Sequence, residues 1–251
     1  MRLILSICLL IHATYGWSEV GNNHHAGRTD TDASVEVNIV SSEWPPYVYL
    51  AEGGRPAGYA YDITLQVMAK SGLQYDFQVL PWSRVYRLGQ SFPNVLISGI
   101  GRTPLREALF HWIAPLTKPN RVHFYRLKSS SISIDQLGQL KDYALAAERD
   151  TYYHQFLQQN GLDKGALVVS YRNKLLKLLL SQRVDFVLMD EVGFSQLVEN
   201  DGLDPELFTP EYQAMVVAEY LAFSKGSSPE MMERVRRAYR ALEQQGELIL
   251  H

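Results

Sequence analysis

The chain has 251 residues, of which 46% are hydrophobic and 20% charged, and its formal net charge at pH 7 is -3. This composition is typical of a globular protein and excludes a largely disordered one. The acidic net charge and the absence of a long basic run argue against a nucleic-acid-binding protein, so no nucleic-acid partner is expected.

The N-terminal residues predict export from the cytoplasm. Met1-Arg2 is a short positive segment, Leu3–Leu10 is almost wholly apolar, and cleavage is favoured after Gly16 or Ser18. This order is that of a secretory signal peptide, and the apolar run is shorter than the about 20 residues that a membrane span requires. We therefore expect a signal peptide at 1–18, a flexible polar leader at 19–34 and a periplasmic location. A buried N-terminal helix is the disfavoured alternative.

Cysteine and histidine positions predict no cofactor and no metal site. Cys8 is the only cysteine and lies inside the apolar run, where Ile7 occupies the position at which a lipid-attachment cysteine would follow a small residue. The mature chain is then free of disulfides. The pair His24-His25 lies in the predicted leader. Because a nucleophile elbow, a P-loop and an HExxH motif are all absent, the sequence gives no sign of an enzyme.

From Val35 onward, strand-like runs alternate with helix-like ones, which is an α/β pattern. About 220 residues suffice for one large domain or two small lobes. In the first half we expect the following elements: strands at 35–40, 75–80, 95–100 and 121–127, a turn at Gly53-Gly54, a helix with Ile63, Val67 and Met68 on one face that ends near Gly72, and a short helix at 83–88.

The pattern restarts in the second half of the chain. We expect strands at 143–147, 167–171, 184–189 and 216–223, and helices at 151–159, around Leu175, Leu176 and Leu179, at 191–198 and from Ser228-Pro229 onward. These are two consecutive βαβ sets with a strand and a helix left over. Since no low-complexity linker separates them, the two lobes should be joined by strands.

Several chemically distinctive residues follow predicted strands, where ligands collect in α/β sheets. The glycines of Ser98-Gly99-Ile100-Gly101 would let a ligand approach the backbone closely. Arg106 lies just beyond, and its guanidinium could hold a carboxylate by two hydrogen bonds. The alternative for Arg106 is a solvated loop arginine.

Five further side chains are candidates at strand or helix ends. Asp190 ends an apolar strand and could bind an ammonium group, and Thr151 opens a helix whose N-terminus could face an anion. For both, the alternative is an N-cap. Tyr47 and Trp82, like Trp44, could wall a pocket or belong to the core.

These motifs together resemble the type II periplasmic solute-binding proteins of family 3, which include the polar amino-acid-binding proteins of ABC importers. The similarity covers roughly residues 35–251. The segments that carry it are Trp44–Tyr47, Gly58–Asp62, Ser98–Arg106, Phe110–Pro115 and Arg183–Asp190.

The resemblance implies two α/β lobes with a ligand cleft between them. Lobe 1 would comprise 35–122 and 219–251, and lobe 2 would comprise 123–218, with crossings near 122–126 and 216–221. In amino-acid-binding members, the residue equivalent to Arg106 holds the ligand carboxylate with help from the one equivalent to Thr151. The residue equivalent to Asp190 receives the ammonium group.

The sequence also departs from the family pattern. Gly99 and Gly101 stand where many members carry hydroxyl side chains, and Arg149-Asp150 replaces a small glycine-containing turn. Trp82 stands where the family often places an aromatic ring against the ligand, whereas Arg84 has no assigned role.

The favoured function is a monomeric, non-enzymatic receptor that captures a small zwitterionic or anionic solute, foremost an amino acid, by hinge closure for an ABC importer. One alternative is an enzyme similar to the cyclohexadienyl dehydratases, with Glu43 or Asp190 as general acid. Another is a ligand-sensing module for a membrane receptor. The expected partners of the protein are a small-molecule ligand and a permease or sensor in the membrane.

Overall fold

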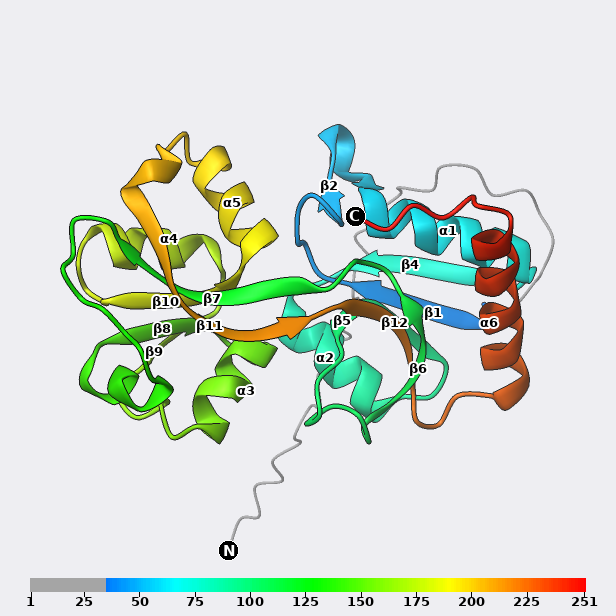
Figure 1. Cartoon of the computed structure of the whole chain (residues 1–251). Helices are drawn as coiled ribbons and strands as arrows, with labels where there is room; N and C mark the ends of the chain where they lie inside the picture. Colours follow the sequence, from blue (N-terminus) through cyan, green and yellow to red (C-terminus); the bar gives the residue numbers. More distant parts are fainter. Residues whose placement is uncertain (1–34) are drawn as a thin grey trace, which may run out of the picture. The chain divides into compact units, whose positions relative to one another are not determined.

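The computed structural model describes residues 35–251. The predicted signal peptide and leader, with Cys8 and the histidine pair, lie outside them. The described residues form two five-stranded sheets, each covered by helices on both faces (Figure 1). This confirms the expected two-lobed α/β fold. No helix in this part of the chain has the length and apolar character of a membrane span.

The sheet of lobe 1 has the strand order β4-β1-β5-β12-β6. Strand β1 pairs in parallel with β4 and β5, while β12 runs antiparallel to β5 and β6. The elements are β1 (Val37–Ser41), β4 (Tyr75–Val79), β5 (Val95–Gly101), β6 (Phe110–Pro115), β12 (Glu219–Ser224), α1 (Tyr59–Ser71), α2 (Trp82–Ser91) and α6 (Pro229–Gln244).

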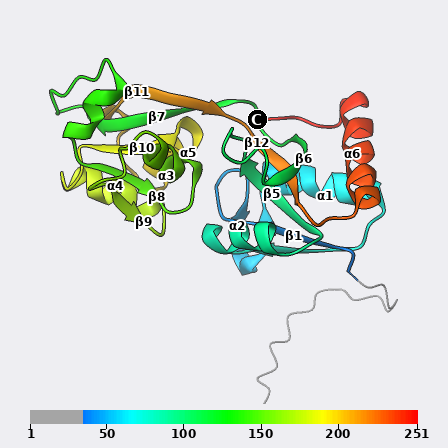
Figure 2. The same ribbon diagram turned by 90° about the horizontal axis from the view of Figure 1, so that it is seen from below.

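Alternation along the strands divides the lobe 1 core into two layers. Helices α1 and α6 cover one face of this sheet, and α2 covers the other (Figure 2). Ile39 and Leu96 pack against α1 and α6, whereas Val40 and Ile97 pack against α2. All seven residues of β5 are buried. As expected, α1 ends at Gly72, whose φ of 68° is in the left-handed region that glycine favours.

The sheet of lobe 2 has the strand order β11-β7-β10-β8-β9. Helix α3 covers one face, and α4 and α5 cover the other (Figure 1). The elements are β7 (Asn120–Leu127), β8 (Leu145–Glu148), α3 (Tyr152–Gln159), β9 (Leu167–Val169), α4 (Asn173–Leu180), β10 (Phe186–Asp190), α5 (Glu191–Asn200) and β11 (Phe208–Val217). Short elements complete the chain: β2 (Tyr49–Leu50), η1 (Glu52–Gly54), β3 (Pro56–Ala57), η2 (Leu137–Asp142) and η3 (Pro205–Leu207).

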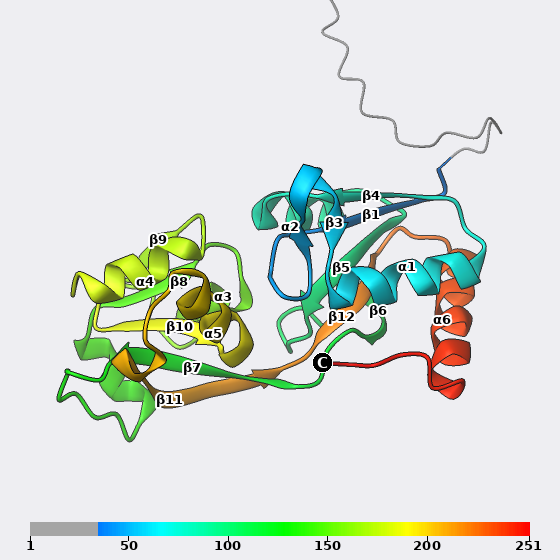
Figure 3. The same cartoon turned by 90° about the horizontal axis from the view of Figure 1, so that it is seen from above.

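Two antiparallel strands, β7 and β11, run side by side toward lobe 1 (Figure 3). The chain changes sheet between β6 and β7, at 116–119, and again at Ala218 between β11 and β12. The second change lies within the expected range 216–221. The first lies before the expected 122–126, because β7 belongs to the second sheet along its whole length.

The predicted strand at 216–223 is in fact two strands that belong to different sheets. Of the longer strand, β11, only the last two residues fell within the prediction. The rest was not predicted because the strand alternates poorly and contains Pro210. It pairs only with β7, with two register irregularities. An edge strand of this kind lacks the continuous apolar run of a buried one. Strand β6 was likewise missed as a strand, although its residues were part of a recognised motif.

Gly58→Ala should destabilise lobe 1 because a methyl group there would lie 2.4 Å from the Tyr47 carbonyl oxygen, and because the φ of 119° strains any side chain. We expect the free energy of unfolding to fall by about 2–4 kcal/mol in a urea titration. Gly54→Ala, with a φ of 74° but open surroundings, should cost only about 1 kcal/mol. Equal losses for the two variants would show that the close approach to Tyr47 is unimportant.

A candidate functional site between the two lobes

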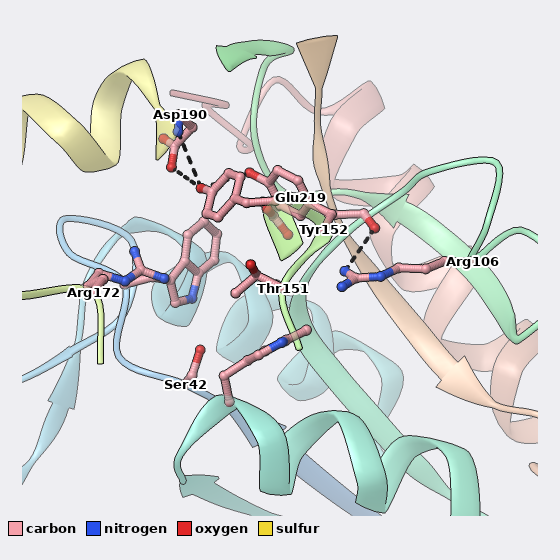
Figure 4. A pocket seen from close by; sticks show the side chains of 12 residues that line it. Ser42, Arg106, Thr151, Tyr152, Arg172, Asp190 and Glu219 are labelled. Carbon is pink, nitrogen blue, oxygen red and sulfur yellow. Dashed lines mark hydrogen bonds between the residues drawn. The ribbon is translucent and has the colours of Figure 1, made fainter. Parts of the chain in front are cut away.

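Residues of both lobes line two adjacent pockets with volumes of about 40 and 20 Å³. We call the two together the cleft, because they share Trp44, Tyr152, Arg172, Asp190 and Glu219. The larger pocket is also lined by Ser42, Trp82, Gly99, Gly101, Arg106, Thr151 and Tyr153 (Figure 4).

The cleft lies where strands of both sheets end. In lobe 1, β1 leads into Ser42 and Trp44, and β5 ends at Gly101. In lobe 2, β8 leads to Thr151 and β10 ends at Asp190. The larger pocket therefore brings together six of the eight site residues that were predicted from the ends of strands: Trp82, Gly99, Gly101, Arg106, Thr151 and Asp190.

Arg106 has no exposed surface, and its guanidinium is hydrogen bonded on three sides. Nε donates to Gln155 Oε1 at 2.9 Å, Nη1 to the Gly101 carbonyl at 3.4 Å, and Nη2 to the Asp150 carbonyl at 3.3 Å. Burial lowers the pKa of Arg106 from its ordinary value. Because Gln155 and Asp150 belong to lobe 2, Arg106 joins the two lobes.

Aromatic side chains enclose the same guanidinium. Its central carbon lies 5.3 Å, 5.0 Å and 5.7 Å from the ring centres of Trp82, Tyr86 and Tyr152. Such stacking supplements the hydrogen bonds with cation–π attraction. A solvated loop arginine, the alternative weighed above, is therefore wrong for Arg106.

The Arg149-Asp150 turn also ties lobe 2 to lobe 1. Trp82 Nε1 donates to the Asp150 carbonyl at 2.7 Å, the same oxygen that Arg106 uses. Asp150 has a φ of 60°, a conformation in which glycine would be unstrained. The acceptor that the two lobe 1 donors share is a main-chain carbonyl, which a glycine at this position would offer as well.

Thr151 is the N-cap of α3. Its hydroxyl donates to the Glu148 carbonyl at 2.7 Å and accepts from the His154 amide at 3.4 Å. The capping alternative is correct for this residue, and its side chain also lines the cleft.

Asp190 is the N-cap of α5 and lines the cleft as well. One carboxylate oxygen accepts from Gly193 N at 2.8 Å and from Asn120 Nδ2 at 2.6 Å. The other accepts from the Tyr153 hydroxyl, which in turn accepts from Tyr152 (Figure 4). Three donors therefore already bind this carboxylate. Burial raises the pKa of both tyrosine hydroxyls well above the ordinary value for tyrosine.

Aromatic rings lie so close to Gly99 and Gly101 that a side chain at either position would clash with them. A methyl group on Gly99, whose φ is 95°, would lie 2.3 Å from the Trp44 ring, and one on Gly101 would lie 2.6 Å from Tyr152. Both glycines line the larger pocket next to these rings, and their close approach to a ligand stays a prediction.

Ser98 does not line the cleft in the described structure. It is fully buried, its hydroxyl lies 2.8 Å from Thr64 Oγ1 of α1, and its carbonyl accepts from Ser41 Oγ at 2.6 Å. Because strand side chains alternate, the Ser98 side chain points to the face of the sheet that α1 covers. In this structure its hydroxyl makes a core hydrogen bond, and its contact with a ligand stays a prediction.

Tyr47 lines the smaller pocket and also belongs to the lobe 1 core. Its ring stacks on Trp44 with 4.6 Å between the ring centres. Burial, followed by the charge of Asp190, raises the pKa of Tyr47 to about 12. Both expected roles, wall and core, are therefore filled by one residue.

Two charged residues of the cleft were missed in the sequence. Arg172, just before α4, lies with Nε 3.3 Å from Oε2 of the buried Glu148. Glu219 begins β12, and burial raises the pKa of its carboxyl to about 7, although Arg106 lowers it. A signal for Glu219 existed, since it is the one acid in the apolar run 216–223. Arg172 follows a short edge strand and gave no such signal.

Glu43, one of the two carboxylates considered as a general acid, is exposed and does not line either pocket. Its carboxylate accepts from the Leu50 amide at 3.3 Å. Arg84 is exposed on α2.

Comparison with known proteins identifies the fold family. The sequence profile of the bacterial extracellular solute-binding proteins, family 3, matches residues 37–249. A search of curated proteins gave no match.

Solved structures of similar fold include binding proteins and a sensor. A histidine kinase sensor domain similar to periplasmic binding proteins superposes with a TM-score of 0.74 at 20% identity, covering 84% of this chain and 92% of that chain. A mutant of ArgBP from T. maritima gives 0.71 at 14% identity, with 84% and 91% covered. The amino acid ABC transporter substrate-binding protein AbpA from Streptococcus pneumoniae, bound to L-arginine, gives 0.68 at 18% identity, with 85% and 91% covered. At these identities the likeness establishes the fold.

Glu219→Gln should remove a pH dependence of stability. With its pKa raised from 4.5 to about 7, Glu219 favours folding fully below about pH 4.5 and loses this contribution as the pH rises through 7. Relative to the variant, the wild type should lose up to about 3 kcal/mol of unfolding free energy between pH 5 and pH 8. Chemical denaturation at several pH values measures the difference. Glu43→Gln is the matched control, and an unchanged slope in Glu219→Gln would refute the raised pKa.

Proposed function

Because the chain belongs to the bacterial extracellular solute-binding proteins of family 3, we propose that it is a receptor that binds a free amino acid in the cleft. The observation that carries this proposal is the placement of opposite charges in one pocket. Arg106 comes from lobe 1, Asp190 comes from lobe 2, and both line the larger pocket. A zwitterion offers a partner to each, and buried charges require partners.

In this proposal the ligand carboxylate binds Arg106 and the N-terminus of α3 at Thr151. A carboxylate accepts two parallel hydrogen bonds from a guanidinium, which is stronger than the 3.3 Å and 3.4 Å bonds that Arg106 makes to main-chain carbonyls. The ammonium group binds on the side of Asp190. Trp44 and Trp82 enclose the remainder of the ligand.

Binding requires the lobes to open and close. Cavities of about 40 and 20 Å³ hold a few water molecules and are too small for an amino acid. We place the hinges at the two changes of sheet, in 116–119 and at Ala218, because β7 and β11 pair continuously beyond them. On opening, Trp82 and Arg106 would then lose their hydrogen bonds to the Asp150 carbonyl.

The family and the predicted signal peptide support a proposal for the cellular role. We propose a monomeric periplasmic protein that delivers an amino acid to the permease of an ABC importer. The Streptococcus pneumoniae structure of similar fold, an amino acid ABC transporter substrate-binding protein, supports this role. The sensor-domain relative keeps open the second role, in which the closed form is presented to a membrane receptor. In neither role does the chain bind nucleic acid.

A non-enzymatic function fits the two carboxylates first considered for catalysis. Glu43 is exposed outside the cleft, and the Asp190 carboxylate is bound by three donors. Glu219, with a pKa of about 7, is the carboxyl on which a general-acid mechanism would depend. Incubation with prephenate or arogenate and detection of an aromatic product tests this alternative directly, and we expect no product.

The receptor function is tested by a thermal-shift screen of the twenty standard L-amino acids, followed by calorimetric titration of those that raise the melting temperature. Arg106→Ala should weaken binding roughly 30-fold or more, because it leaves the ligand carboxylate without its main donor. Arg106→Lys, which keeps the charge and loses the bidentate geometry, covers the case in which the alanine variant does not fold. Arg84→Ala on the exposed face of α2 is the control, and unchanged affinity in both Arg106 variants would refute the assignment.

A further inference from the structure

Glu219 is held at the point where the chain re-enters lobe 1. It is the first residue of β12, directly after Ala218, and its backbone pairs with Gly101 of β5. Its amide donates to Thr117 Oγ1 at 3.0 Å, and its carbonyl accepts from Leu116 N at 2.7 Å. Glu219 therefore contacts both segments at which the chain changes sheet, 116–119 and Ala218. It also lines both pockets of the cleft.

Charged and titratable groups from both lobes face the Glu219 carboxyl. They are Arg106 beyond β5, Tyr47 of the loop after β1, Tyr152 of α3, Arg172 before α4 and Asp190 at the end of β10. Burial and the charge of Asp190 raise the pKa of Glu219, whereas the charges of Arg106 and Arg172 lower it.

Neither arginine forms an ion pair with Glu219 among the described residues. Arg172 is paired with Glu148, and Arg106 binds Gln155 and two main-chain carbonyls. The ionised form of Glu219 therefore lacks a direct cationic partner in a partly buried site, and its proton is correspondingly retained.

Asp190 has the opposite character. Its carboxylate is stabilised as an anion by Gly193 N, Asn120 Nδ2 and the Tyr153 hydroxyl. It lines the cleft, and its hydrogen-bonding capacity is largely used. A cationic group that enters beside Asp190 needs further acceptors, and Glu219 is the other carboxylate that lines the same two pockets.

We propose that Glu219 is a second acceptor for the ammonium group of the bound amino acid, and that binding releases the proton of Glu219. This inference rests on the proposed receptor function and adds to it a binding residue and a coupling to pH. A cation near a carboxyl stabilises the ionised form, so ligand binding and deprotonation of Glu219 favour each other. A simple carboxylate without an ammonium group gains nothing from Glu219, which makes this residue a determinant of specificity.

The test uses calorimetric titration of the wild type, Glu219→Gln and Glu43→Gln with each standard L-amino acid that raises the melting temperature of the wild type. Titrations are made at pH 6 and pH 8, and at pH 7 in phosphate and in Tris, whose ionisation enthalpies differ. With a pKa of about 7, the ionised fraction of Glu219 rises from about one-tenth to about nine-tenths between pH 6 and pH 8. The wild type and Glu43→Gln should therefore bind about tenfold more tightly at pH 8 than at pH 6.

Glu219→Gln should bind with an affinity that varies less than about twofold between the two pH values, and with the same heat in both buffers. Proton release of about half a proton at pH 7 in the wild type, absent in Glu219→Gln, would support the proposal. A wild-type affinity independent of pH, or a tenfold change that persists in Glu219→Gln, would overturn it and leave the receptor function intact. If none of the twenty amino acids binds the wild type at either pH, both the receptor function and this inference are wrong.

Discussion

A guanidinium without exposed surface lies at the boundary of the two lobes, and the geometry of the cleft depends on it. Arg106 reaches Gln155 and the Asp150 carbonyl of lobe 2 from its position beyond β5 of lobe 1. The rings of Trp82 and Tyr86 lie around it and contact the same two lobe 2 residues through hydrogen bonds. A buried arginine is costly unless its donors are satisfied. Its donors are satisfied here by protein acceptors, and in the proposed receptor an exchange of these acceptors for a ligand carboxylate would couple binding to lobe closure.

Three carboxylates near the cleft are stabilised in different ways. Glu148 is paired with Arg172, and Asp190 is bound by helix, strand and tyrosine donors. Glu219 has neither arrangement, and its pKa of about 7 expresses this difference. Two of the three acids thus hold charges that stabilise the architecture, whereas the third can change its charge near neutral pH. Such a division of roles among neighbouring acids is common at functional sites.

The sequence was informative where chemistry is local. Asp190 and Thr151 follow strands and precede helices, so their positions at the cleft and their capping roles could both be predicted. Arg172 and Tyr152 could not, because their place in the cleft depends on how lobe 2 packs against lobe 1. Gly101 was placed at the cleft from its position at a strand end, whereas only the tertiary structure shows the Tyr152 ring against it.

The same limit applied to the fold. Alternation and end signals located the buried strands and the helices α1, α3 and α5. They failed at Ala218, where one apolar run passes from an edge strand of one sheet to a central strand of the other. Strand periodicity reports burial and not sheet membership, so a crossing inside such a run leaves no mark in the sequence.

The two links between the lobes, at 116–119 and at Ala218, have a further effect on binding. A ligand held by one lobe meets the other half of its site on the same molecule, so the second set of contacts forms at an effective concentration set by these short connections. Because one of them is a single residue, the entropy lost when the lobes meet is small. A ligand that contacts each half only weakly can then be retained with an affinity that neither half would give alone.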